Sequence, residues 1–139
     1  MPEGGKYGKI PRPESIQYFL DAIGRHNKVR KIEQVEEQLF KITKTNGRKV
    51  LVHLTNIYVV SEAEVIEIMS SHNHIDAIVT ISTWNSYSVS GKEVAKANKI
   101  GLFLMDEFMG ALNFDGNLFI NYLTPYQREQ LKKEKRSLF

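Results

Sequence analysis

The chain has 139 residues, of which 42% are hydrophobic and none is cysteine, and its formal net charge is +3. This length predicts one compact domain with a hydrophobic core that folds without a metal or a disulfide. The lack of cysteine excludes zinc ribbons, thiol nucleophiles, iron–sulfur clusters and disulfide scaffolds. The small net charge conceals a separation: residues 1–49 carry +5, residues 50–127 carry −5 and residues 128–139 carry +3. Either the basic ends bind a polyanion, or the oppositely charged parts neutralise each other in the fold.

The first third of the chain predicts an arm, a helix and a strand. Residues 1–13 hold three glycines and three prolines, which predicts a flexible N-terminal arm. Apolar residues then recur at helical spacing from Ile16 to Ile23, so we expect a helix with one buried face. Alternating side chains over residues 29–36 predict a short strand.

A β-hairpin is the clearest local prediction. Residues 39–45 and 48–55 are strand-like and flank Asn46-Gly47, a dipeptide that supplies the positive φ of a tight turn. In the second arm, Val50, Val52 and Leu54 should share one face of the sheet. Leu51, His53 and Thr55 should share the other, because side chains alternate along a strand.

From the second hairpin arm onward, strands and helices alternate as far as residue 112, and the rest of the chain departs from this order. Ser61 and Glu64 form a capping box, which predicts a helix start, and Ser90 with Glu93 predicts another. The remaining expected elements are buried strands at 75–83 and 101–105, a helix at 106–112, an edge strand at 118–122 and a final helix from Thr124-Pro125.

This order favours an α/β sandwich with a partly parallel sheet. We divide the chain into the arm (1–13), an α/β domain (14–124) and a basic C-terminal helix (125–139). No apolar run approaches the roughly 18 residues of a membrane span, and the N-terminus lacks an apolar signal core. We therefore expect a cytoplasmic protein that does not contact membranes.

Strong catalytic motifs are missing from the sequence. It has no glycine-rich phosphate loop, no Gly-x-Ser-x-Gly elbow and no helical histidine pair with zinc-protease spacing. We therefore expect no catalytic residue, no bound metal and no cofactor.

The order of elements resembles the restriction-endonuclease-like PD-(D/E)XK superfamily, in its Mrr-type and Holliday-junction-resolvase-type branch. The resemblance covers roughly residues 14–112 and is carried by the strand Asp76–Thr83, the Glu93-Val94-Ala95-Lys96-Ala97 helix and the segment Ile100–Asp106. It implies a three-layer sandwich with a central mixed β-sheet flanked by helices.

The same resemblance implies where a nuclease centre would lie. These enzymes hold a divalent metal between an aspartate on the first hairpin strand and a Glu/Gln-x-Lys motif on the second. The matching positions are Leu39 or Phe40, then His53 and Thr55, and none has the expected residue type. We interpret Phe40, His53 and Thr55 as degenerate active-site positions, or simply as tolerated residues.

Cations and one aromatic loop are the candidate nucleic-acid contacts. The expected contacts are Lys41, Lys44, Arg48, Lys49, Trp84, Asn85, Lys132 and Lys133. The hairpin cations could instead keep an edge strand from aggregating, Trp84 could cover the core, and the basic end could be a solvated tail.

Three functions follow from these readings. The first is a catalytically inactive nuclease-fold protein that binds nucleic acid, most simply DNA, through its basic hairpin and termini. The second is a protein-interaction module on the same fold, a regulator or inhibitor of another factor, which presents its acidic middle to a partner. The third is a divergent metal-dependent nuclease that uses Glu36 or Glu37 with His53 and Asp76. The resemblance also implies a possible homodimer.

Overall fold

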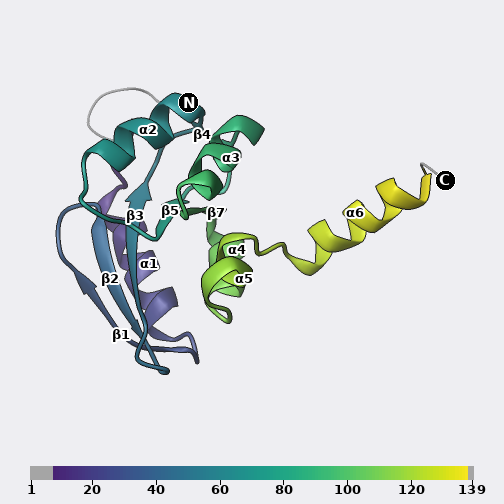
Figure 1. Ribbon diagram of the computed structural model, residues 1–139. Coiled ribbons are helices and arrows are strands. Elements are labelled where there is room, and N and C mark those ends of the chain that lie inside the picture. The colour runs from purple at the N-terminus through teal and green to yellow at the C-terminus, as the bar shows by residue number, and fades with distance from the viewer. Residues whose placement is uncertain (1–7, 138–139) are drawn as a thin grey trace.

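The computed structural model describes residues 8–137, which form a five-stranded mixed sheet with helices on both faces (Figure 1). The strand order is β1-β2-β3-β5-β7. The first three strands are antiparallel, whereas β3, β5 and β7 run parallel. Their bounds are β1 (Val29–Gln34), β2 (Leu39–Lys44), β3 (Lys49–Thr55), β5 (Ala77–Thr80) and β7 (Gly101–Leu104). The predicted α/β class with a mixed sheet flanked by helices is confirmed.

The helices form a layer on each side of the sheet. On one face, α1 (Pro13–Gly24), α4 (Met105–Ala111) and α5 (Gly116–Ile120) contribute to one apolar cluster. On the other face, α2 (Glu62–Ser70) and α3 (Val89–Ala97) contribute to a second. The last helix, α6 (Pro125–Ser137), projects away from both layers (Figure 1). Among the residues described, no helix is both long and apolar enough to cross a membrane.

The hairpin between β2 and β3 forms as predicted. Gly47 has φ +88° in the turn, a value that a residue without Cβ adopts without strain. Val50, Val52 and Leu54 all belong to the cluster on the α1 side. The alternation of residues in β3 therefore places His53 and Thr55 on the α2 side, as expected.

Residues 118–122 were predicted as an edge strand, and this prediction is wrong. Residues Gly116–Ile120 form α5, and both Phe119 and Ile120 are buried in the cluster on the α1 side. A strand would point these neighbours to opposite faces, whereas a helix turns both toward one core. The Phe119 ring packs edge-on against Phe103 with centroids 5.2 Å apart.

The start of α3 also differs from the prediction. Ser61 and Glu64 form the expected capping box, in which Glu64 Oε1 accepts the Ser61 N–H at 3.1 Å. Helix α3 instead begins at Val89, because Ser88 Oγ accepts the Gly91 N–H at 3.0 Å. The predicted pair Ser90 and Glu93 therefore lies inside the helix.

A second small sheet joins β4 (Val59–Val60) to β6 (Ser86–Tyr87) in parallel. A Cβ at Gly91 would lie 2.6 Å from the Val60 carbonyl oxygen, so glycine lets α3 pack closely on β4. The two strands are too short for the sequence pattern to show them.

Part of the predicted flexible arm is bound to the domain. Residues 1–7 lie outside the described part of the chain. In the remainder, the Lys9 carbonyl oxygen accepts hydrogen bonds from the Asn56 N–H at 2.8 Å and the Thr55 hydroxyl at 2.9 Å. These bonds hold the segment before α1 against the end of β3.

Candidate functional site

The degenerate nuclease positions divide between the two faces of the sheet. Phe40 pairs with Val52 and is fully buried on the α1 side, with its ring 5.1 Å from that of Phe19. Leu39 pairs with His53, so it is Leu39 that shares the face of His53. Neither Phe40 nor Leu39 has a side chain that can ligate a metal.

His53 belongs to a buried polar network. Its Nδ1 lies 2.9 Å from His72 Nε2, and its Nε2 lies 3.4 Å from the Gln38 side-chain nitrogen. Because that nitrogen can only donate, the network assigns the His53 proton to Nδ1, which donates to His72. Burial, assisted by the nearby His72, lowers the pKa of His53 from 6.5 to about 4. The imidazole is therefore neutral at pH 7.

Acid should destabilise the protein through His53. The unfolded chain protonates this group below about pH 6.5, whereas the folded chain resists protonation down to about pH 4. The unfolded state therefore binds more protons in this window, and the free energy of unfolding should fall by about 2 kcal/mol between pH 7 and pH 5. Urea unfolding at both pH values measures this loss. His53→Gln should remove most of it, and an unchanged pH dependence in this variant would contradict the assignment.

Thr55 has a structural role. Its side chain is fully buried, and its hydroxyl donates to the Lys9 carbonyl and accepts from the Ile57 N–H at 3.3 Å. Across residues 8–137, no three His, Asp or Glu side chains converge in a way that could hold a metal ion. The combination of Glu36 or Glu37 with His53 and Asp76 is therefore not assembled.

The predicted hairpin cations have different surroundings. Lys44 is only 2% exposed, and its ammonium donates to Asp115 Oδ1 at 2.9 Å and to the Phe114 carbonyl at 2.8 Å. Arg48 lies 3.8 Å from the same carboxylate. Lys44 thus joins the hairpin to the segment before α5 and offers no free charge to a ligand.

Lys41 and Lys49 lie on the opposite face, together with Lys31. Strand register places these three lysines on one face of β1, β2 and β3, which we call the lysine face. The apolar cluster beneath α2 and α3 includes no residue of β1, so these helices leave the lysine face open. The Glu33 carboxylate lies 3.6 Å from the Lys31 ammonium and 3.7 Å from the Lys41 ammonium, so it partly neutralises the charge of the lysine face.

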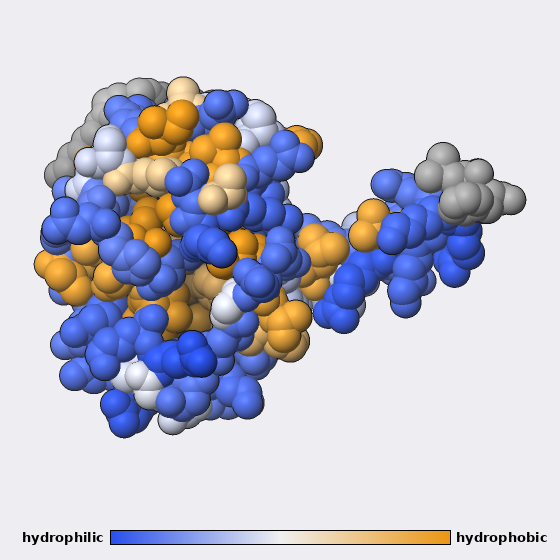
Figure 2. Space-filling view, in the orientation of Figure 1, coloured by the Kyte–Doolittle hydropathy of each residue, from blue (hydrophilic) through white to orange (hydrophobic). Residues whose placement is uncertain are grey.

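Helix α6 carries the most strongly basic surface. None of its residues is buried, and it stands clear of the domain as a largely hydrophilic rod (Figure 2). Four cations have the spacing i, i+4, i+7, i+8 of a single helical face. This basic stripe consists of Arg128, Lys132, Lys135 and Arg136. The predicted contact Lys132 lies on the stripe, whereas Lys133 is turned about 100° away.

The stripe is only partly neutralised. Arg136 lies 4.0 Å from Glu129, and Arg128 donates to the Leu123 carbonyl at 3.1 Å. Within the part of the chain described here, Lys132 and Lys135 form no ion pair. Their ammonium groups are available to an anion.

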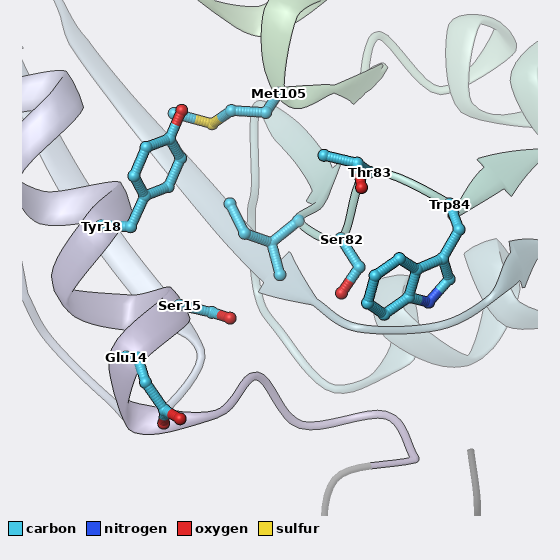
Figure 3. A pocket seen from close by; sticks show the side chains of 8 residues that line it. Glu14, Ser15, Tyr18, Ser82, Thr83, Trp84 and Met105 are labelled. Carbon is cyan, nitrogen blue, oxygen red and sulfur yellow. The ribbon is translucent and has the colours of Figure 1, made fainter. Parts of the chain in front are cut away.

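Trp84 and Asn85 follow β5 but are placed differently. The Trp84 side chain is 68% exposed and lines a groove with Tyr18, Ser82 and Met105 (Figure 3). Asn85 is buried, and its amide donates to Thr80 Oγ1 at 2.9 Å and Asn56 Oδ1 at 3.1 Å. Trp84 is accessible to a ligand, whereas the Asn85 amide nitrogen is bound within the protein. Trp84 does not share this groove with His53.

A buried polar cluster was not anticipated from the sequence. Glu107 is 2% exposed, and its carboxylate accepts the Leu104 N–H at 2.8 Å, the Tyr87 hydroxyl at 2.7 Å and the Gln127 amide at 2.5 Å. Lys92 lies beside it, donates to the Leu102 carbonyl and stands 4.6 Å from the Phe103 ring centre.

Protonation in this cluster follows from burial and charge. Burial lowers the pKa of Lys92 to about 8, against the opposing effect of Glu107. Burial and the hydrogen bond to Glu107 raise the pKa of Tyr87, so its hydroxyl stays protonated and donates. One sequence signal could have indicated part of this cluster. Glu107 lies three residues after Leu104, which is the spacing at which a carboxylate caps the start of a helix.

Comparisons of the chain with family models, with curated proteins and with solved structures find no match. The restriction-endonuclease-like resemblance therefore stays a prediction based on element order. An α/β fold by itself does not determine a function, which depends on the chemistry of particular surfaces.

Proposed function

We propose that this protein binds nucleic acid through the phosphate backbone, with the basic stripe of α6 as the main contact, and does not cleave it. The observation that supports this proposal most directly is the stripe itself. Four cations share one face of a helix that buries none of its side chains in the domain. Phosphate contacts of this kind give affinity without sequence preference.

An isolated helix of this length needs a partner. A helix of 13 residues is marginally stable in water unless it packs against something. A reciprocal cap holds its start, since Thr124 N–H donates to Gln127 Oε1 at 2.8 Å and Gln127 N–H donates to Thr124 Oγ1 at 3.2 Å. Phosphates along a groove would neutralise the stripe and hold the remaining turns in place. Self-pairing of two such stripes would bring like charges together.

The lysine face supplies a second and weaker contact in this proposal. Lys41 and Lys49 are the predicted hairpin contacts that point to solvent on this face, and Lys31 joins them. Glu33 reduces their combined charge. We therefore expect the lysine face to contribute less to nucleic-acid affinity than the basic stripe of α6.

The absence of cleavage follows from residue types at the nuclease-like positions. Leu39, His53 and Thr55 provide no carboxylate there, and phosphodiester hydrolysis with Mg²⁺ or Mn²⁺ needs hard oxygen ligands. A plasmid and a branched junction incubated with either metal should stay intact. Metal-dependent cutting that persists after repeated purification would contradict this half of the proposal.

Binding is tested by fluorescence anisotropy with a labelled DNA duplex of about 20 base pairs. The dissociation constant should rise steeply between about 50 and 200 mM salt, because binding releases counterions. The double variant Lys132→Gln/Lys135→Gln should bind about tenfold more weakly at about 100 mM salt, and the slope of log K against log salt should fall by roughly 2.

The matched control is Lys31→Gln/Lys49→Gln, which removes the same charge from the lysine face. We expect a loss below about threefold for this variant. An equal or larger loss in the control would place the contact on the sheet. No binding at low salt would reject nucleic acid as the partner and favour the protein-interaction module.

A further inference from the structure

We propose that the groove beside Trp84 binds an arginine side chain from a basic, extended segment of a partner protein. The groove lies where β5 and β7 end, between α1 and α4, and it does not involve α6 or the lysine face. This proposal goes beyond nucleic-acid binding and would add a protein partner.

The groove is large enough for a side chain and its flanking backbone. Two adjoining hollows of about 540 and 320 Å³ share the residues Tyr18, Ile81, Ser82, Thr83 and Met105, so they form one continuous groove. The carboxyl edge of parallel strands is the usual ligand position in open α/β sheets. A volume of this size is typical of sites that hold small ligands or peptide side chains.

Two exposed aromatic rings border the groove. The Trp84 side chain is 68% exposed, and Tyr18 is 55% exposed. Figure 3 shows Tyr18 on the α1 side and Trp84 on the opposite side, with Ser82 between them. A guanidinium group stacks well on such rings, because it is planar, weakly hydrated and attracted to their negative faces.

Two carboxylates give the groove a negative charge. Glu14 lines one end and Asp106 the other, and neither forms an ion pair within residues 8–137. Asp106 Oδ1 accepts the Glu107 N–H at 2.9 Å, which orients this carboxylate at the first turn of α4. Among residues 8–137, no lysine or arginine lines either hollow. The groove therefore attracts a cation and repels a phosphate.

Polar atoms between the carboxylates complete the match to a guanidinium. Ser82 Oγ donates to Asn56 Oδ1 at 2.5 Å, so its oxygen remains an acceptor toward the groove. The five N–H donors of arginine can use several acceptors at once, whereas a lysine ammonium has three. This difference favours arginine over lysine.

The indole N–H of Trp84 reports directly on occupancy, because the chain has one tryptophan. The test titrates the full ¹⁵N-labelled chain with acetyl-Gly-Arg-Gly-amide up to about 20 mM and follows this resonance. Since single arginine contacts on exposed rings are weak, we expect a dissociation constant on the order of 1–10 mM. The same peptide with citrulline, which has the same shape without charge, should bind about fivefold more weakly.

Substitutions of the two carboxylates test whether they contribute to binding of the arginine peptide. Asp106→Asn and Glu14→Gln should each weaken the arginine peptide about threefold, while the exposed control Glu93→Gln should leave it unchanged. Equal binding of the citrulline peptide, or no shift with the arginine peptide, would overturn the proposal. A shift produced by uncharged cytidine would assign the groove to a base, and a shift on dilution of the free protein would assign it to a second copy. Each of these last two results would also overturn it.

Discussion

Replacing Glu107 by alanine should lower the free energy of unfolding by about 3–5 kcal/mol, which is the largest effect we expect from one polar side chain. The carboxylate is almost wholly buried and accepts hydrogen bonds from Leu104, Tyr87 and Gln127. Alanine would leave these donors without an acceptor and Lys92 without its opposing charge. Urea unfolding followed by circular dichroism measures the loss.

Two variants separate the causes of this loss. Glu107→Gln keeps one acceptor oxygen and removes the charge, so it should cost roughly 1–2 kcal/mol. Glu93→Ala removes an exposed carboxylate on α3 and should change stability by less than about 0.5 kcal/mol. A Glu107→Ala protein as stable as the Glu93→Ala protein would show that the cluster contributes nothing.

Replacing Lys44 by alanine should destabilise the protein by about 2–4 kcal/mol. The ammonium is buried between β2 and the segment that leads to α5, where it bonds Asp115 and the Phe114 carbonyl. The hydrogen bond from Lys44 lowers the pKa of Asp115 and so favours the charged form of this carboxyl group. Asn46 Nδ2 also donates to Asp115 Oδ2 at 2.9 Å, and because this bond does not involve Lys44, we expect it to compensate part of the Asp115 charge in the variant.

The exposed Lys49 is the matched control for Lys44, and Lys49→Ala should cost less than about 0.5 kcal/mol. Thermal unfolding of Lys44→Ala, Asp115→Ala and the double variant should reveal a coupling of about 1–3 kcal/mol. Simple additivity of the two single losses would exclude a specific pair. Any loss of DNA binding by Lys44→Ala has to be corrected for unfolded protein.

Helix α6 is attached to the buried Glu107 cluster, because the Gln127 side chain in its first turn donates a hydrogen bond to Glu107. Loss of Glu107 would therefore loosen the attachment of the proposed nucleic-acid contact as well as the domain. The basic stripe itself begins at Arg128 and would keep its charges. Its position relative to the domain would become less defined.

Local sequence patterns predicted the elements whose formation depends on neighbouring residues. Asn46-Gly47 sets the hairpin, Ser61 with Glu64 starts α2, and Thr124-Pro125 starts α6. Strict alternation in β3 also predicted the correct faces for His53 and Thr55. The fold class followed from the order of these elements.

The same patterns failed where two signals compete locally. Residues 118–122 are rich in β-formers, yet Gly116 has φ +61° and the following turn places Phe119 and Ile120 together in the core. Ser88 and Ser90 are both acceptable caps by residue type, and the close contact of Gly91 with Val60 selects Ser88. Only packing decides between such alternatives.

The separation of charge along the chain leads to two outcomes in the structure, because some of the charges are paired inside the fold and others are exposed to solvent. The sequence alone established a cysteine-free α/β domain with basic ends and an acidic middle, because composition and periodicity are properties of the chain. The tertiary structure decided which charges are available. It buries Lys44 against Asp115, opens the lysine face, frees the stripe on α6 and places Glu14 and Asp106 at the two ends of one groove. These pairings join residues far apart in the sequence, and burial and distance set the energy of each charge.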